Sequence, residues 1–285
     1  MKMKSLFARN LLFGLAISIG LYGCDETDPI DPGPDPDPQE MSFKEGARYE
    51  FNTYATDAET DEKVALSERT KVWTLAETNV SFEGKSGVAM YLDSIFNLGV
   101  VDVVDTVYLA QESNNDIYRH ALLIPELDLS VIGITDLVFT SDWRHEAKLG
   151  ATSANWFVGQ VRDTFEYETG IDVIKGFVLT LTDSAVASSE ESIMIDGTSY
   201  VSTKTTHKLE LALTALFEQG PFVVPLQLKS VSLNRYTWTV PSLGVIAREE
   251  REGAVIEAEF QGQAIPKIPI PGYVSVMTEV LATGG

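Results

Sequence analysis

The stretch that decides the fold is TSYVSTKTTHKLELALTALF, residues 198–217. Its leucines recur at every second position, at 209, 211 and 213, and His207 has the same parity. A period of two is typical of a strand with one buried face, whereas a helix repeats every 3.6 residues. The run from 206 to 220 also has good helix formers and ends in glycine, so a helix is the alternative. The Thr and Val residues that come before the leucines favour the strand.

Similar alternation recurs along the chain. Residues 47–56 alternate through Tyr49 and Phe51 and, less regularly, Tyr54. Turn-forming residues separate further strand-like runs at 83–85, at 113–116 and at the Pro-Ser-Leu-Gly corner of 241–244. Consecutive strands with polar turns predict an all-β fold. We expect a large curved antiparallel sheet, as a half-barrel, a barrel or a sandwich.

Two segments interrupt this pattern. Ser141 could cap a short helix or turn that ends at Gly150. Residues 182–197 are rich in Ser, Asp and Glu and predict a long exposed loop. We expect residues 41–285 to form one antiparallel β domain. If there are two domains, this loop is a weak candidate for the linker between them.

The first 23 residues have the pattern of a secretory signal. A head with Lys2, Lys4 and Arg9 precedes eleven uncharged residues, 11–21, which are too few to span a bilayer as a helix. The run ends in Leu21-Tyr22-Gly23-Cys24, which resembles the bacterial lipobox. The resemblance implies cleavage before Cys24, a diacylated thiol and an amine acylated by a chain such as palmitate. Cys24 is the only cysteine, so an intrachain disulfide is excluded and a spare buried thiol is the alternative.

Residues 24–40 predict a disordered tether. Positions 25–40 hold seven acids and five prolines with no base, so neither a helix nor a strand ladder can form and like charges extend the chain. Acids directly after a lipidated cysteine resemble two opposed sorting signals, one for inner-membrane retention and one for export to the cell surface. With Asp25, Glu26 and Asp28 present, we expect an outer-membrane lipoprotein on the periplasmic or the surface-exposed face.

The composition excludes some partners. The chain has 42 acids and 21 bases, a formal net charge of −21, with 44% hydrophobic residues. Nucleic-acid binding depends on phosphate neutralisation by Lys and Arg, so it is not expected. Electrostatic docking on anionic lipid is not expected either, and the acyl chains would have to anchor the protein.

Two segments carry a second resemblance, IDGTSYVSTKTTHKLEL (195–211) and YTWTVPSLGVIAREE (236–250). Together they are similar to a family of uncharacterised envelope β-proteins with a curved, lipoprotein-carrier-like sheet. The resemblance covers residues 195–255 and implies an open concave sheet with an apolar inner face. Such a face suits acyl chains or another hydrophobic ligand. The resemblance assigns no binding or catalytic residue.

No catalytic or cofactor motif is present in the sequence. A nucleophile elbow, a phosphate-binding glycine loop and a His-Glu-x-x-His helix are all missing, so we expect neither an enzyme nor a cofactor. His120, His145 and His207 lack metal-ligand spacing. Residues 57–68 place acids at several calcium-loop positions, but Glu62 stands where a glycine is needed. We therefore expect a solvated hairpin tip there and no metal site.

Other residues suggest contact with sugars. Trp143 and Trp156 could form a carbohydrate platform with the neighbouring polar residues 142, 144 and 146, or they could be ordinary core residues. Three Asp-Ser/Thr-apolar triplets, with acceptors at Ser94, Thr106 and Ser184, resemble O-glycosylation sites of some Gram-negative periplasms.

The sequence therefore predicts a membrane-anchored, non-enzymatic envelope lipoprotein. Its partners would be the membrane, through the lipid anchor, and a hydrophobic small molecule or an envelope protein. The alternatives are a surface glycan-binding or glycan-degrading accessory lipoprotein and a structural envelope component.

Overall fold

The structure is a computed structural model that describes residues 40–97, 99–112, 115–122, 141–166, 174–260 and 263–284. These residues belong to one compact unit, Pro36–Gly285. Cys24 and the tether up to residue 39 lie outside the described residues. Within the described part, no helix is long and apolar enough to cross a membrane.

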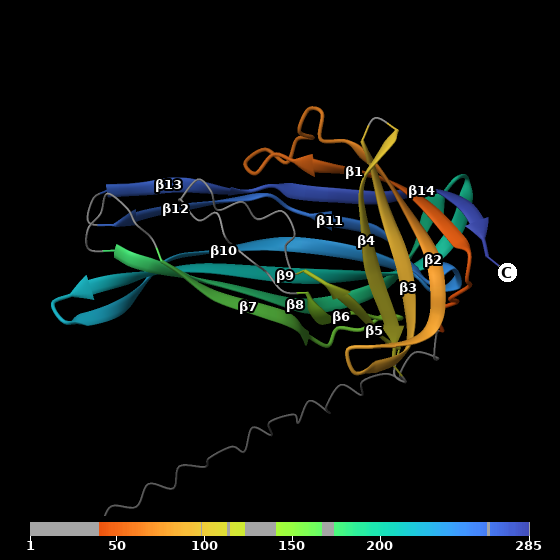
Figure 1. Cartoon of the computed structure of the whole chain (residues 1–285), viewed down its shortest axis with the longest axis horizontal. Helices are drawn as coiled ribbons and strands as arrows, with labels where there is room; N and C mark the ends of the chain where they lie inside the picture. Colours follow the sequence, from red (N-terminus) through yellow and green to blue (C-terminus); the bar gives the residue numbers. More distant parts are fainter. Residues whose placement is uncertain are drawn as a thin grey trace, which may run out of the picture. The chain divides into compact units, whose positions relative to one another are not determined.

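The described residues form strands β1 to β14 and a single 3₁₀ turn, η2 (Figure 1). Their bounds are β1 Ala47–Thr56, β2 Arg69–Phe82, β3 Lys85–Asn97, β4 Val100–Gln111, β5 Asp116–Ala121, β6 Asp142–Lys148, β7 Trp156–Glu166, β8 Ile174–Ile195, β9 Thr198–Gln219, β10 Phe222–Val240, η2 Pro241–Leu243, β11 Val245–Arg251, β12 Ala254–Phe260, β13 Gln263–Ile270 and β14 Gly272–Thr283.

Twelve of these strands form one antiparallel sheet in the order β6-β5-β4-β3-β2-β1-β14-β11-β10-β9-β8-β7. The sheet bends until its edges approach, because β6 at one edge contacts β7, β8 and β9 near the other. Thr152 and Ser188 exchange backbone hydrogen bonds of 2.8 and 3.1 Å at this junction. The sheet is therefore a nearly closed barrel, which confirms the predicted fold class.

The bend brings the two halves of the sheet face to face. Figure 1 shows β2, β3 and β4 running steeply across the long strands β8 to β10. Side chains from both halves share one core, which we call the first core: Ala47, Tyr49, Phe51, Trp73, Leu75, Ala89, Tyr91, Leu109, Ile195, Val240, Val245, Ile246, Ala247 and Met277. Packing of one half on the other gives each half a partner for its apolar face.

A second core fills the other end of the curved sheet. The two-stranded sheet β12–β13 lays Ile256, Ile268 and Ile270 on the leucines of β8, β9 and β10. The full set is Ile174, Phe177, Leu179, Leu181, Leu209, Leu211, Leu213, Ala215, Leu233, Ile256, Ile268 and Ile270. The predicted apolar inner face is therefore present here, and it is covered by the chain's own hairpin.

The predicted turns at 83–85 and 241–244 are found where the sequence places them, whereas residues 113 and 114 of the third lie outside the described residues. A further turn joins β8 to β9. Asp196 and Gly197 have φ values of +45° and +74°, and Glu83 and Gly84 have +43° and +82°. Two consecutive positive φ values characterise the two-residue hairpin turns that match the twist of a sheet. Residues 206–219 belong to β9, so the strand and not the helix is correct.

Two hydroxyls fix the corner between β10 and β11. Tyr49 Oη donates to the carbonyl of Leu243 at 2.6 Å, and Tyr91 Oη donates to that of Gly244 at 2.7 Å. Burial raises the pKa of Tyr49 to about 12, so this donor keeps its proton at physiological pH. The Pro-Ser-Leu-Gly corner of the sequence is thus tied to the first core.

Two local predictions are wrong. Residues 142–148 form β6 rather than a short helix, and residues 182–195 continue β8, which pairs with β9 along this stretch. Both segments place charged side chains on the inner face of the sheet, which breaks the apolar alternation expected of a strand. The same charged side chains form the site described next.

Candidate functional site: a charged chamber inside the sheet

Ionisable side chains occupy inward positions on several strands of the sheet. On β8, Asp183 stands between the buried residues Leu181 and Ala185, and on β10, Arg235 stands between Leu233 and Thr237. Alternation forces each of these charges into the interior. We call the following six residues the charge cluster: Arg119 (β5), Glu146 (β6), Asp183 (β8), His207 (β9), Arg235 (β10) and Glu249 (β11).

Arg235 is the centre of the charge cluster. Its Nη1 lies 2.5 Å from Glu146 Oε1 and 3.3 Å from Glu249 Oε1. Its Nη2 donates to Asp183 Oδ2 at 2.7 Å and lies 3.1 Å from His207 Nδ1. One guanidinium therefore joins side chains from β6, β8, β9 and β11, and so links the two edge regions of the sheet.

Arg119 makes the second link. Its two terminal nitrogens donate to Glu249 at 2.9 and 3.1 Å in a bidentate pair. Its Nη2 also lies 3.6 Å from Glu146 Oε1. Because β5 and β11 are far apart in the strand order, this pair holds opposite walls of the barrel together.

Burial favours the neutral form of each group in the cluster, and the opposite charges of its neighbours favour the ionised form. Burial alone would raise the pKa of Asp183, but Arg235 and His207 outweigh it and hold that pKa at about 2. For Glu249, burial is likewise outweighed, by Arg119 and Arg235, and its pKa lies well below the usual range. The same acids hold the pKa of Arg235 well above its ordinary value, although burial acts in the opposite direction. Asp183, Glu249 and Arg235 are therefore charged at neutral pH.

A cavity of about 500 Å³ adjoins the charge cluster. We call it the chamber. Five basic side chains line it, against three acidic ones. The basic set is Arg69, Lys71, Arg119, Arg235 and Arg251, and the acidic set is Asp93, Asp105 and Glu249. Aromatic and aliphatic side chains line the rest, among them Tyr54, Trp73, Ile95, Val107, Leu122 and Tyr273.

The basic side chains of the chamber differ in how they are paired. Arg69 donates from Nη1 to the carbonyls of Leu66 and Glu68, and it has no carboxylate partner among the described residues. Lys71 lies 3.9 Å from Asp93 and over the ring of Trp73. Burial raises the pKa of Asp93, and Lys71 opposes this effect only in part.

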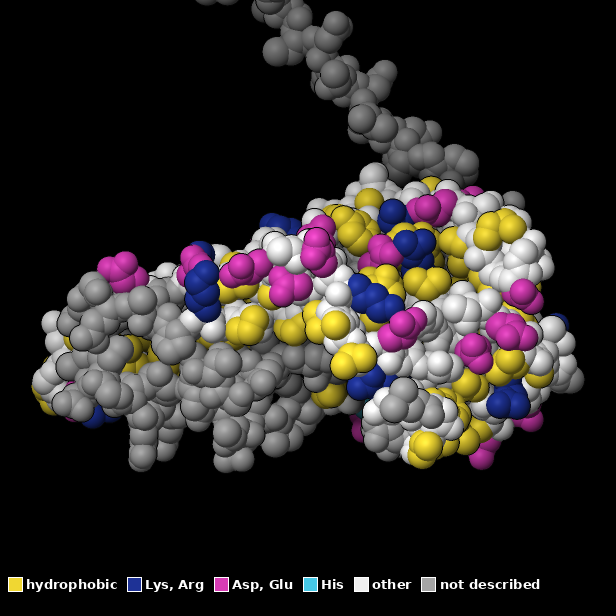
Figure 2. Space-filling view, turned by 90° about the horizontal axis from the view of Figure 1, so that it is seen from above, with side chains coloured by type: hydrophobic (Ala, Val, Ile, Leu, Met, Phe, Trp, Pro, Cys, Tyr) yellow, Lys and Arg dark blue, Asp and Glu magenta, His cyan; other side chains and the backbone are white. Residues whose placement is uncertain are grey.

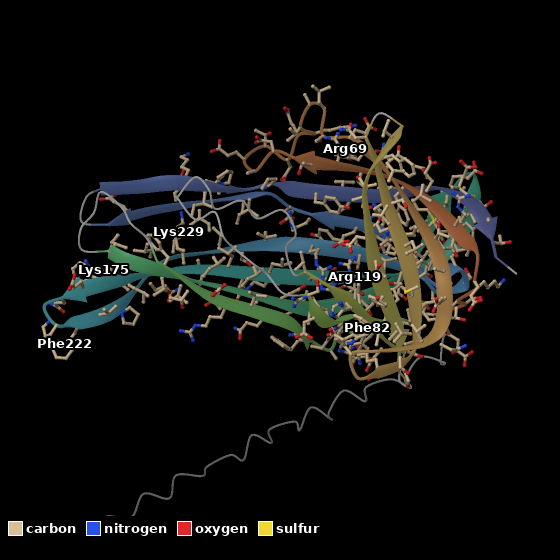
Figure 3. The ribbon with its side chains drawn as sticks, viewed as in Figure 1. Arg69, Phe82, Arg119, Lys175, Phe222 and Lys229 are labelled. Carbon is tan, nitrogen blue, oxygen red and sulfur yellow. The ribbon has the colours of Figure 1, made fainter. Side chains whose placement is uncertain are left out.

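The buried donors of the chamber wall are not all satisfied. Arg119 Nε and Arg235 Nε are buried and have no acceptor in the part of the chain that the structure describes. A buried donor without an acceptor costs about 1–3 kcal/mol. Figure 3 shows Arg119 in the interior of the curved sheet and Arg69 above it, nearer the upper edge of the view.

The two tryptophans singled out in the sequence lie in an aromatic band made of two groups of rings, with Lys85 over a ring of each. Trp143 packs edge-on against His120 at 5.5 Å and Phe82 at 6.2 Å, and its Nε1 donates to the carbonyl of Glu83. Trp156 lies 5.4 Å from His145 and donates to its carbonyl. The band consists of Phe82, Tyr108, Tyr118, His120, Trp143, His145 and Trp156, with Lys85 over the rings of Tyr118 and Trp143. Both indoles are half-buried.

The three histidines are separate from one another, each beside a carboxylate. His120 pairs with Glu83 at 3.2 Å, His145 with Asp116 at 3.1 Å, and His207 with Asp183 at 3.3 Å. Burial is the main reason that the pKa of His145 lies below its usual value. Within the described ranges, no group of His, Cys, Asp and Glu is placed to hold a metal ion.

The calcium-like segment forms the connection between β1 and β2. Asp57 Oδ1 accepts hydrogen bonds from the backbone of Glu59 at 2.9 Å and of Thr60 at 3.0 Å. The carboxylate is thereby used to close a turn, as expected for a hairpin tip.

The three O-glycosylation candidates are strand residues. Ser94 lies on β3, Thr106 on β4 and Ser184 on β8, all half-buried. Their preceding acids differ, because Asp93 and Asp183 face the interior whereas Asp105 is exposed.

Sequence reasoning did not identify most of the charge cluster. It noted that His207 shares the parity of the leucines, and this is confirmed by the burial of that ring. Arg235 has the same signal, a charge in phase with Leu233 on an alternating strand. Arg119 and Glu249 could not be singled out, because their pairing depends on strands that are distant in sequence.

On the surface of the domain, acidic and basic side chains are intermixed. In Figure 2, Lys and Arg side chains lie among Asp and Glu side chains, with hydrophobic ones between them. This mixed surface contrasts with the chamber, where bases outnumber acids in a chain that has twice as many acids as bases.

Comparison with known proteins assigns no family. No family model matches the chain, and no curated protein matches it. Among solved structures, a Bacteroides fragilis protein that is described as exported and as having a YMCC-like fold matches with a TM-score of 0.38 and 9% identity. The match covers 86% of this chain and 99% of that protein. A likeness this weak identifies neither a family nor a function.

Proposed function

We propose that this chain is a non-enzymatic envelope lipoprotein of the outer membrane, anchored through Cys24, whose β domain binds a small amphipathic anion in the chamber. The anchor is supported by the basic head, the apolar run and the lipobox at 21–24. Two or more acyl chains hold a protein firmly at a membrane, whereas a single chain binds reversibly.

The observation that carries the binding role is the convergence of five basic side chains on one cavity of about 500 Å³. Cavities of 300–1,000 Å³ are typical of small-molecule sites. Glu146 and Asp183 offset Arg235, so the attraction for an anionic group comes mainly from Arg69, which has no carboxylate partner among the described residues. Trp73, Ile95 and Val107 offer an apolar surface to the rest of the ligand. A fatty-acid anion or a similar amphiphile has this combination of features.

Another cavity of about 510 Å³ is a weaker candidate. Its lining includes the acids Glu50 and Glu68 and the exposed Thr278, and Arg69 is its only basic residue. Asn52 donates to Glu68 there at the surface. Of these two cavities, the chamber alone combines buried charges with a tryptophan in its wall.

A binding role fits the state of the titratable groups better than a catalytic one. A general base works best with a pKa near the operating pH. The acids Glu146, Asp183 and Glu249 instead have lowered pKa values because arginines face them, whereas burial raises the pKa of Asp93. Permanently charged groups can orient and neutralise a ligand, but they are poor at exchanging protons with it.

The aromatic band supports a second candidate function, binding of a surface glycan. Aromatic rings stack on the apolar faces of sugars, and Trp143 and Trp156 both belong to the band. Their rings pack against neighbouring rings and both indole N–H groups are used internally, which leaves less free ring surface than a sugar platform needs. A structural envelope component is a third candidate function.

The anchor predicts the outcome of a single substitution. We expect Cys24→Ala to remove acylation, so that the protein accumulates as uncleaved precursor or as unanchored chain in the periplasm. The measurement is mass spectrometry of the purified chain together with membrane fractionation. Val201→Ala, at an exposed position on β9, should leave both unchanged. An unmodified thiol in the wild-type protein would contradict the anchor.

The chamber predicts charge-dependent binding. We expect the fluorescent anion 8-anilinonaphthalene-1-sulfonate to bind saturably, and laurate to displace it better than dodecanol, which lacks the charge. Arg69→Gln should weaken laurate binding about tenfold, because a hydrogen bond to a charged group contributes about 1.5–3 kcal/mol. Fluorescence titration gives both affinities.

The matched control is Arg48→Gln, which removes an exposed arginine of β1 outside the chamber. Equal affinities for Arg69→Gln and Arg48→Gln would show that the chamber is not the binding site. A response of tryptophan fluorescence to polysaccharide, without binding of either anion, would support the glycan candidate instead.

A further inference from the structure

The hairpin that joins β9 to β10 ends in an exposed apolar tip. Gly220 makes the turn with φ of +62°, and β10 then begins with Phe222, Val223 and Val224. These side chains are 71%, 56% and 40% exposed, and Leu226 is 46% exposed. We call residues 220–226 the β9–β10 tip. Figure 3 shows Phe222 at the far end of this hairpin.

The exposure of the tip does not alternate. Every residue from 218 to 227 is exposed, although successive side chains of a strand point to opposite faces. Both faces of the hairpin end are therefore apolar and uncovered. A protein partner with a flat surface would cover only one of them, whereas lipid surrounds an inserted element on all sides.

The charges around the tip fit a bilayer interface. Residues 219–228 contain no charged side chain in a chain with 42 acids and 21 bases. The nearest charges are Lys229 on β10 and the pair formed by Lys175 and Glu218, 2.9 Å apart, of which Glu218 lies opposite Val223 in the hairpin. A lysine at the base of an inserted element can extend its ammonium to the lipid phosphates. Figure 3 shows Lys175 beside the tip and Lys229 farther from its end.

A second copy of the chain is a poorer occupant. Dimerisation through a strand edge needs free backbone N–H groups, and Pro225 removes one of them in the middle of the tip. Prolines on edge strands are a common protection against strand addition. The tip is thus unsuited to pairing with another strand, while its apolar side chains remain exposed.

We propose that the β9–β10 tip inserts into the interfacial layer of the lipid bilayer. This inference rests on the anchor of the proposed function, which holds the domain at the membrane, but not on the chamber. At about 3.1 Å per residue, residues 24–40 span at most about 50 Å, so the anchor keeps the domain within that distance of the lipid. Because Glu218 lies opposite Val223, its ion pair with Lys175 offsets the charge of this acid when the tip enters the interfacial layer, where inserted elements lie about 5–10 Å deep.

The test uses the full chain with its acylated Cys24, reconstituted into vesicles of phosphatidylethanolamine and phosphatidylglycerol. Val224→Cys provides a site for the environment-sensitive label NBD. Its matched control is Met194→Cys on β8, an apolar position that is 64% exposed near the opposite hairpin, where β8 meets β9. We expect the label at 224 to shift to shorter wavelength and to be quenched at least twofold by brominated lipid, while the label at 194 is unaffected.

A further substitution links the signal to the tip. Phe222→Ser in the Val224→Cys chain should remove most of the quenching, because the largest apolar side chain of the tip is lost. Equal quenching at 224 and 194, or none at 224, would overturn the inference. Labelling of the wild-type chain would instead show a free Cys24 thiol, and so contradict the anchor. The difference between positions 224 and 194 would still test the tip, since both chains would carry the same additional label.

Discussion

Replacing Arg235 by methionine is expected to lower the free energy of unfolding by about 3–5 kcal/mol. The guanidinium is 4% exposed and contacts Glu146, Asp183 and Glu249. Its removal leaves two fully buried carboxylates without their main partner, and an uncompensated buried charge is among the most destabilising changes in a protein. Urea unfolding followed by circular dichroism measures the effect.

Two further variants separate loss of charge pairing from loss of packing. Arg162→Met removes an exposed arginine of β7 and should change stability by less than about 0.5 kcal/mol. Combining Arg235→Met with Glu146→Gln and Asp183→Asn should recover part of the stability, since no buried carboxylate is then left alone. If the triple variant is as unstable as the sum of its parts, the charge cluster does not act as a coupled unit.

The same cluster makes the protein sensitive to acid. The pKa of Asp183 is about 2 in the folded chain and near 3.8 in an unfolded one, so the folded state binds protons less readily. This difference stabilises the fold above about pH 4 by about 2 kcal/mol, and the contribution is lost as the pH falls through 4 to 2. Glu146 and Glu249, whose pKa values are also lowered, add to the effect in the same direction.

Chemical denaturation at pH 7 and at pH 3 tests this prediction. The wild-type chain should lose several kcal/mol between the two, whereas Asp183→Asn should be less stable at pH 7 and lose less on acidification. Glu279→Gln, at an exposed position of β14, should follow the wild-type curve. An unchanged acid dependence in Asp183→Asn would mean that this carboxylate is not held by Arg235 in solution. Arg235→Met should also differ least from the wild type at pH 3, where its stranded acids can protonate.

The sequence predicts the strands that alternate cleanly and fails where charge enters the interior. β9 carries an unbroken run of leucines on one face, and its strand structure is confirmed. The segments around Glu146 and Asp183 were expected to be a helix or turn and a loop. Both are strands whose inward positions hold acids, so hydrophobic period alone could not identify them. The rule that buried residues are apolar fails where a charged partner comes from a distant strand.

The chamber is predicted even less well, because it depends on how far the sheet bends. Lys71 and Trp73 on β2 come to face Arg235 on β10 only after the two halves of the sheet fold over each other. No local property of either strand encodes that crossing. Trp143 and Trp156 could be selected from the sequence as aromatic candidates, but their mutual arrangement on β6 and β7 could not.

The β12–β13 hairpin makes part of the barrel self-occupied. Ile256, Ile268 and Ile270 cover the apolar inner face of β8, β9 and β10, which would otherwise be exposed. The chain's own hairpin thus occupies the place of an apolar ligand at one end of the sheet, whereas the chamber at the other end stays open and is lined by basic side chains. For the binding role proposed above, selectivity should therefore change when this hairpin is shortened or replaced, while the surrounding sheet stays the same.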